Sequence, residues 1–197
     1  MDRRIALKNT ALALGYAISG PTLASFLSGC QADPSLDWKP QIFSLPQAKL
    51  VAELAETILP RTDTPGAKDV LVDRFMDKIL TGAYDIEGQQ NFLQGLDAFQ
   101  KDCKSANGKV FEHCTSEQKQ SLLKKLEAAS NSTPWSIWGN AVGEAQETPF
   151  YRQFKELTVL GYFASEKIGE EVLNYEPIPG RYNGCVPSEK VGKVWSL

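Results

Sequence analysis

Few residues in this sequence have the types and the spacing that enzyme chemistry needs. The single histidine, His113, has no cysteines or carboxylates around it at metal-ligand spacing, which favours an ordinary surface histidine in a loop. The chain has no C-x-x-C-H for haem attachment, no G-x-G-x-x-G after a strand and no G-x-S-x-G. We therefore assign no catalytic, cofactor-binding or metal-binding residues and do not expect an enzyme in this chain alone. Four carboxylates on predicted helix faces are expected to be simply solvated: Asp73, Asp77, Glu170 and Glu171.

The first thirty residues carry chemistry of another kind, namely export and lipidation. Arg3 and Arg4 stand side by side before an apolar residue, a pattern close to a twin-arginine export signal. A nearly uncharged stretch follows, and residues 27–30 read Leu-Ser-Gly-Cys, the form of a lipobox that ends at Cys30. A transmembrane helix needs about 20 strongly apolar residues, whereas glycine, serine and proline interrupt this stretch. The pattern therefore predicts a removable signal.

Two interpretations of Cys30 are open. If the lipobox is used, Cys30 becomes the first mature residue and carries lipid, which anchors the protein without a spanning helix. The alternative is an ordinary cysteine near a signal-peptidase I site. The first interpretation predicts an exported, periplasmic lipoprotein that is held at a membrane. Twin-arginine export also implies that the cargo crosses already folded.

Behind the signal at residues 1–29, the sequence predicts a tether and one helical domain. Loss of the signal leaves 18 basic and 23 acidic residues, and this negative balance argues against a nucleic-acid partner. Residues 30–43 have two prolines and no hydrophobic period, which indicates a tether. Residues 44–197 form the predicted domain. Three tether residues are candidates to dock on it: Trp38, Ile42 and Phe43.

Apolar residues at three- and four-residue spacing predict an all-α domain, a single bundle of about five or six helices with a long irregular C-terminal tail. The first helix opens at Ser44-Leu45-Pro46-Gln47, where serine and glutamine can form a capping box, and stops at Pro60. The other predicted helices are Val70–Gly82, Glu87–Lys104, one opened by a Thr115–Gln118 capping box, and Pro149–Phe163, with Ser165–Tyr175 continuing after a kink at Gly161.

Two segments do not fit the helical pattern. Residues 130–147, which include Trp135 and Trp138, read as a functional loop or an insertion. Residues 175–187 form the tail, in which three prolines and two glycines exclude a helix. Such a tail must be ordered by packing or by a partner.

The order of several short segments resembles one protein family. After the export signal and the Ser44–Gln47 helix opening come Ile58-Leu59-Pro60, Thr62-Asp63-Thr64-Pro65-Gly66-Ala67, Phe154-Lys155-Glu156-Leu157-Thr158, Leu160-Gly161-Tyr162-Phe163 and Pro179-Gly180-Arg181-Tyr182-Asn183-Gly184-Cys185. Together they resemble the gluconate 2-dehydrogenase subunit 3 family over nearly the whole mature chain.

The resemblance implies a small, non-catalytic subunit of a membrane-associated sugar or sugar-acid dehydrogenase. In such complexes a large FAD-dependent subunit of the glucose-methanol-choline oxidoreductase type performs the oxidation, and a cytochrome c subunit with its haem c passes the electrons on. The large subunit commonly lacks a signal and is carried across by the small one. No cofactor is expected in this chain. The candidate partner contacts are Asp63, Pro65, Gly66, Arg181, Tyr182 and Cys185.

Cysteine usage adds one expectation for an oxidising compartment. With Cys30 assigned to lipid, Cys103 and Cys114 flank the Asn107-Gly108 turn, which can fold one back on the other. A disulfide there would close a loop of about 12 residues and stabilise the fold by about 2 to 3 kcal/mol. Cys185 is then the odd cysteine. It is expected at the subunit interface, as a disulfide or a buried thiol, and the alternative is a free thiol on this subunit's own surface.

A competing hypothesis from another class shares the export signal and the helical domain. On this hypothesis the chain is a free-standing envelope lipoprotein that acts as a binding or structural module. A pull-down of the mature domain separates the two hypotheses, since only the subunit recovers a flavoprotein.

Overall fold

The computed structural model describes residues 36–130, 148–176, 178, 180 and 185–196. The chain divides into two units, residues 1–39 and 40–197. In the described part of the second unit the regular elements are helices, which confirms the predicted all-α class. No helix in the described residues is both long enough and apolar enough to cross a membrane.

The first helix of the bundle, α2 (Leu45–Ile58), begins at the capping box that the sequence predicts. The Gln47 backbone N–H donates to the Ser44 hydroxyl at 3.4 Å, and the Ser44 backbone N–H donates to the Gln47 side-chain oxygen at 3.0 Å. Reciprocal bonds of this kind satisfy backbone donors that the first turn leaves unpaired. The apolar face of α2, including Leu50, Val51 and Leu54, is buried.

Three further α-helices follow α2 along the chain before α6. Helix α3 (Val72–Ala83) follows a loop, and α4 (Ile86–Asn107) begins at an Asp85 cap and ends at Gly108, whose φ of 68° is left-handed. A short 3-10 helix, η1 (Phe111–His113), leads to α5 (Ser116–Ser130). The predicted Thr115–Gln118 capping box opens α5, with bonds of 3.0 and 3.3 Å.

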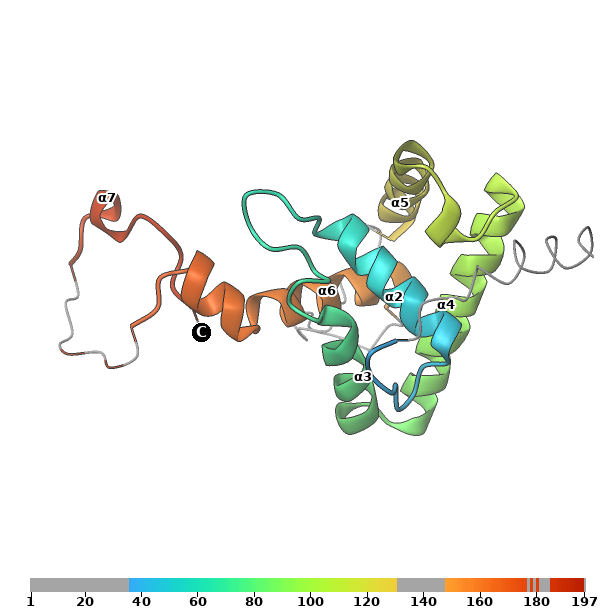
Figure 1. The fold of residues 1–197 in the computed structure, drawn as a ribbon, viewed down its shortest axis with the longest axis horizontal. Coiled ribbons are helices and arrows are strands. Elements are labelled where there is room, and N and C mark those ends of the chain that lie inside the picture. The colour runs from blue at the N-terminus through green and yellow to red at the C-terminus, as the bar shows by residue number, and fades with distance from the viewer. Residues whose placement is uncertain (1–35, 131–147, 177, 179, 181–184, 197) are drawn as a thin grey trace, which may run out of the picture. The chain divides into compact units, whose positions relative to one another are not determined.

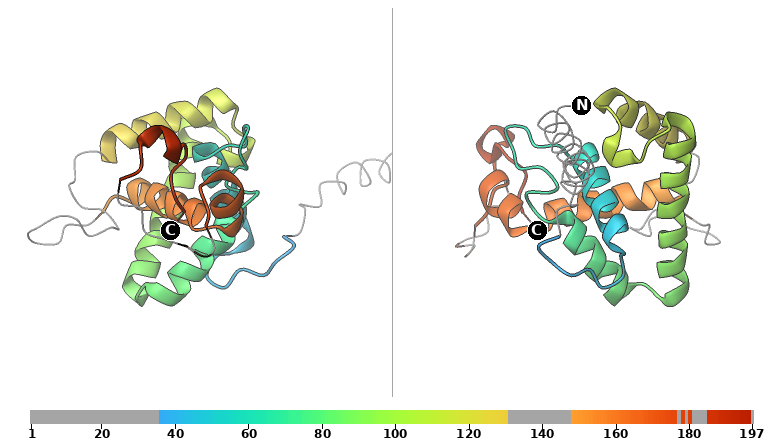
Figure 2. Two further views of the ribbon diagram at one scale, coloured as in Figure 1. Left: turned by 90° about the vertical axis from the view of Figure 1, so that its left-hand side faces the viewer. Right: turned by 45° about the vertical axis from the view of Figure 1, so that its right-hand side comes forward.

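Helix α6 (Phe150–Phe163) is the shared packing partner of the bundle. It contacts α2, α3, α4 and α5, and it crosses the middle of the bundle in Figure 1. Figure 2 shows the long α4 standing along one edge, with α6 running toward it. The buried side chains of α6 recur at helical spacing along the face that packs against the other helices. They include Tyr151, Phe154, Leu157, Thr158 and Tyr162.

An aromatic cluster forms the centre of the core. The rings of Phe92 on α4 and Phe154 on α6 stack with centroids 6.2 Å apart, and Phe150 meets Phe92 edge to face at 5.3 Å. Phe43, which precedes α2, adds a third contact to Phe92 at 6.3 Å. Offset and edge-to-face pairs of this kind add about 0.5 to 1.5 kcal/mol each to the gain from burial.

The expected kink at Gly161 is wrong, because α6 runs without a break through this residue. The reason for glycine here is close packing. A Cβ atom at Gly161 would lie 2.5 Å from the Phe75 ring of α3, far inside van der Waals contact. The helix ends at Phe163, as the sequence predicts. A second helical segment follows over residues 166–172, shorter than the expected Ser165–Tyr175, and its last five residues form a π-helix, η2 (Ile168–Val172).

Two of the carboxylates that were expected to be solvated are buried. Asp73 and Asp77 of α3 are 8% and 1% exposed. The Asp77 carboxylate accepts hydrogen bonds from the backbone N–H groups of Gln41 at 2.8 Å, Ile42 at 3.0 Å and Phe43 at 3.3 Å. Backbone donors of an irregular segment need partners when they leave water, and Asp77 supplies them. The end of the predicted tether is thus bonded to the bundle.

We predict that Asp77→Ala lowers the free energy of unfolding by about 2 to 3 kcal/mol, because it removes a charged acceptor from three backbone donors. The matched control is Asp102→Ala, since Asp102 is exposed on α4, and it should change stability by no more than about 0.5 kcal/mol. Urea unfolding of both variants checks this. Equal losses in the two variants would contradict the role given to Asp77.

Candidate functional site

The loop between α2 and α3, residues 59–71, contains three of the candidate partner contacts and is organised around one carboxylate. Glu56 of α2 accepts the backbone N–H of Arg61 at 3.0 Å and that of Lys68 at 2.9 Å. The Ala67 N–H donates to the Leu59 carbonyl at 2.9 Å and closes the base of the loop. These bonds give an irregular segment a defined shape.

Gly66 is required by the close approach of this carboxylate. A Cβ atom at Gly66 would lie 2.4 and 2.6 Å from the two Glu56 carboxylate oxygens and 2.7 Å from the Arg61 backbone nitrogen. The Gly66 N–H donates to the Asp69 carboxylate at 2.8 Å. Gly66 is therefore buried inside the loop and shapes it.

The far end of α6 reaches the same loop. The Tyr162 hydroxyl donates to the Pro65 carbonyl oxygen at 2.8 Å, while the Tyr162 ring is buried. Of the three candidate contacts, only Asp63 is exposed, whereas Pro65 is half-buried and Gly66 is buried. The structure thus presents Asp63 to solvent and uses Pro65 and Gly66 to hold the loop.

A salt-bridge cluster ties the loop to two helices. Glu53 of α2 pairs with Lys68 of the loop and, at 2.5 Å, with Lys119 of α5. Partial burial alone would raise the pKa of Glu53, but hydrogen bonds and charge from Lys119 and Lys68 outweigh burial and lower it. A carboxylate with a lowered folded-state pKa stabilises the fold above its unfolded-state pKa, and this contribution is lost as the pH falls through the folded value.

A shallow groove opens beside the loop. Residues 69–71 line one side of it, and five residues of the 165–171 segment line the other. Leu71 has a left-handed φ of 58° and is 44% exposed, an uncommon conformation for a residue with a branched side chain. The π-helix η2 lies on the opposite side, and π-helical turns often occur at functional sites. Nothing in the apolar pattern of the sequence indicated either feature.

In the C-terminal segment, residues 173–196, Asn174 is hydrogen-bonded to residues of the stretch 191–196. Its backbone N–H donates to the Val194 carbonyl at 2.8 Å, and its side-chain amide donates to the Val191 and Lys193 carbonyls at 2.7 and 2.6 Å. In Figure 1 the residues that follow the short helix α7 (Ser188–Val191) lead back toward η2. A parallel bridge pairs Asn174 with Trp195.

This segment presents apolar side chains to solvent. Ile178 is 82% exposed, Val194 is 75% exposed, and Tyr175 and Trp195 are each 52% exposed. The free thiol of Cys185 is exposed in the same segment. Four large apolar side chains exposed within one segment make it a candidate interaction surface.

Of the remaining residues that the sequence analysis singled out, the structure describes some and not others. The Cys103 and Cys114 sulfurs lie 3.5 Å apart and are buried, and His113 is exposed at the end of η1. The others lie outside the described residues: Arg3, Arg4, Cys30, Trp135, Trp138, Arg181 and Tyr182.

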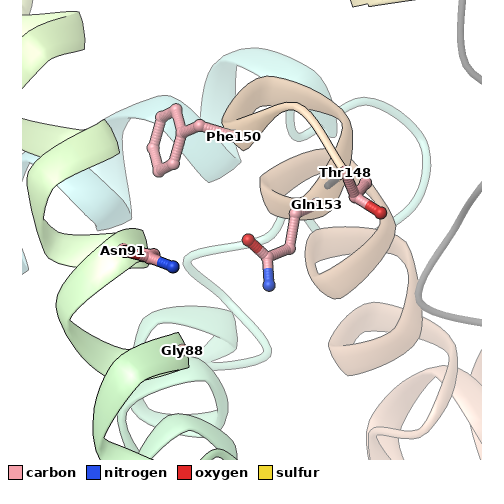
Figure 3. Close-up of a pocket in the computed structure, with 5 residues that line it drawn as sticks. All are labelled: Gly88, Asn91, Thr148, Phe150 and Gln153. Atoms are coloured by element: carbon pink, nitrogen blue, oxygen red, sulfur yellow. The ribbon is translucent and has the colours of Figure 1, made fainter. Parts of the chain in front are cut away.

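A small pocket between α4 and the start of α6 is polar (Figure 3). Asn91 and Gln153 project toward it from the two helices, and Gly88, Thr148 and Phe150 complete the lining. The Gln153 amide also donates to the Tyr84 hydroxyl at 3.1 Å. The lining amides and hydroxyl form hydrogen bonds but are neither acids nor bases near neutral pH. Among the described residues there is also no group of three or more side chains that could hold a metal ion.

A family model described as gluconate 2-dehydrogenase subunit 3 matches residues 46–180. The chain belongs to this family. The match begins in α2, includes the loop and α3 to α6, and ends before Cys185. The family name describes one subunit of a multi-subunit dehydrogenase. Comparisons with curated proteins and with solved structures gave no significant match.

For this subunit 3 domain we predict that Gly66→Ala destabilises the fold by about 1 to 3 kcal/mol, because the added methyl group collides with Glu56 and with the Arg61 backbone. The matched control is Gly82→Ala in α3, where a Cβ atom meets nothing within 4 Å. That variant should be neutral or more stable, since alanine favours a helix. Thermal unfolding compares them, and a Gly66→Ala variant as stable as Gly82→Ala would contradict the model of the loop.

Proposed function

We propose that this chain is the small, non-catalytic subunit of a periplasmic FAD-dependent sugar or sugar-acid dehydrogenase. In this role it supports export, folding and membrane association of a flavoprotein subunit of the glucose-methanol-choline type. The flavoprotein holds the FAD and performs the oxidation, and a cytochrome c subunit with haem c accepts the electrons. Membership of the subunit 3 family supports the accessory role.

The exposed apolar residues of segment 173–196 are the observation that carries this proposal. Burial of these side chains against a partner would stabilise the complex by about 25 cal/mol for every Å² of apolar surface that leaves water. Ile178, Val194 and Trp195 are all at least 52% exposed in the single chain. Contact with a large partner would bury them, and Cys185 would enter the same interface.

The loop between α2 and α3 is a candidate for a second contact with the partner, in addition to segment 173–196. Glu56 and Tyr162 hold residues 59–71 in one conformation before any partner binds. A preformed loop loses little conformational entropy on association, so its contacts contribute more to affinity. Asp63 is the exposed candidate for such a contact.

The export role rests on the arginine pair of the sequence. A flavoprotein that folds around FAD in the cytoplasm needs a route for folded cargo, and a twin-arginine signal on the small subunit would supply it. Cys30 would then anchor the complex through lipid, without a spanning helix. The stand-alone lipoprotein remains the competing function, and it predicts no bound flavoprotein.

To test the proposal, the chain is co-expressed with a flavoprotein of this class that lacks its own signal. We predict that Arg3→Lys with Arg4→Lys leaves both proteins in the cytoplasm, so that periplasmic dehydrogenase activity falls to background. The matched control is Lys8→Arg, which keeps the charge of the signal and should leave export unchanged. Fractionation and activity staining measure both.

Two outcomes would contradict the proposal. If periplasmic activity survives the double substitution, this chain does not carry the flavoprotein across. If the affinity-purified chain recovers no flavoprotein from cells that express both, the stand-alone lipoprotein is favoured.

A further inference from the structure

We propose that Cys103 and Cys114 are a site of oxidation, at which an intramolecular disulfide joins the end of α4 to the segment that leads into α5. Their sulfur atoms lie 3.5 Å apart. A disulfide bond is about 2.05 Å long, so closure needs the sulfurs to approach by about 1.5 Å. Rotation of the two side chains supplies most of that movement.

The surrounding structure holds the two cysteines opposite each other independently of any bond between them. Gly108, at a left-handed φ of 68°, reverses the chain after α4, and its N–H donates to the Lys104 carbonyl at 2.8 Å. The Phe111 N–H then donates to the Gln100 side chain at 3.0 Å, and the Phe111 ring is fully buried. A disulfide formed within such a preset turn adds little strain.

Burial distinguishes this pair from a catalytic dithiol. Cys103 is 0% exposed and Cys114 is 8% exposed. Burial, with a further contribution from the Cys114 thiol, raises the pKa of Cys103 to about 11. A reactive dithiol needs an accessible sulfur with a lowered pKa, because the thiolate is the nucleophile. The Cys103–Cys114 pair therefore has the properties of a structural bond.

The oxidation needs an electron acceptor, and an exchangeable disulfide such as oxidised glutathione or a protein disulfide donor provides it. The two thiols lose two protons and two electrons as the S–S bond forms, and the donor disulfide is reduced to two thiols. Because both sulfurs are buried, exchange takes place before folding is complete or when residues 108–114 open. After closure the bond is shielded from reductant.

Mass spectrometry tests the connection directly. The full chain is unfolded, reduced, and refolded in a buffer of oxidised and reduced glutathione, and its free thiols are then alkylated under denaturing conditions. We expect Cys103 and Cys114 in one cross-linked peptide pair, with Cys30 and Cys185 alkylated. Alkylation of both Cys103 and Cys114, or a link from either to Cys30 or Cys185, overturns the proposal.

Thermal unfolding gives a second readout that does not depend on a folded cysteine variant. A chain that is reduced while unfolded and then refolded in reductant should have a Tm about 5 to 10 °C below that of the oxidised chain, as expected for opening a loop of this length in a protein of this size. Cys185→Ser, the matched control, should keep this dependence. A double Cys103→Ala and Cys114→Ala variant should lose it. Equal Tm values for the oxidised wild-type chain and for the wild-type chain refolded in reductant would overturn the proposal.

Discussion

Burial of α6 among the other helices is the constraint on which the rest of the structure depends. One end of α6 places Phe150 and Phe154 against Phe92, which forms the aromatic centre of the core. At the other end, the Tyr162 hydroxyl donates a hydrogen bond to the Pro65 carbonyl, and the chain continues into η2. The same helix therefore carries the largest core contacts and positions both surfaces that could meet a partner. Gly161 permits this arrangement because any side chain there would meet Phe75.

Carboxylates order the segments that lack regular structure. Asp77 accepts three backbone N–H groups ahead of α2, and Glu56 accepts two from the loop that follows it. Hydrogen bonds to a charged acceptor are worth about 1.5 to 3 kcal/mol, more than neutral ones. Glu53 pairs with Lys68 of the same loop and with Lys119 of α5. An irregular surface with such anchors keeps its shape without a partner, which suits recognition.

Much of the fold could be predicted from the sequence because local signals agreed with the packing. The Ser44–Gln47 capping box begins α2, and apolar spacing locates α6. Periodicity shows which face is buried, but it does not show which carboxylate turns inward to meet backbone donors, so Asp77 was misjudged. The close contact of Gly161 with Phe75 and the π-helical turn after α6 depend on tertiary packing, and no local pattern indicates them. Spacing alone did suggest that Cys103 and Cys114 are neighbours, and their sulfurs lie 3.5 Å apart.

The central proposal is that segment 173–196 and the preformed loop are where this subunit 3 domain would contact a flavoprotein subunit. Backbone hydrogen exchange, measured on the chain alone and in the purified complex, tests this most directly. The account predicts that amides around Tyr175 and Trp195 become protected in the complex. The amides of Arg61 and Lys68, which are already hydrogen-bonded to Glu56, should exchange slowly in both states. Unchanged exchange throughout 173–196, with protection gained on another face, would contradict it.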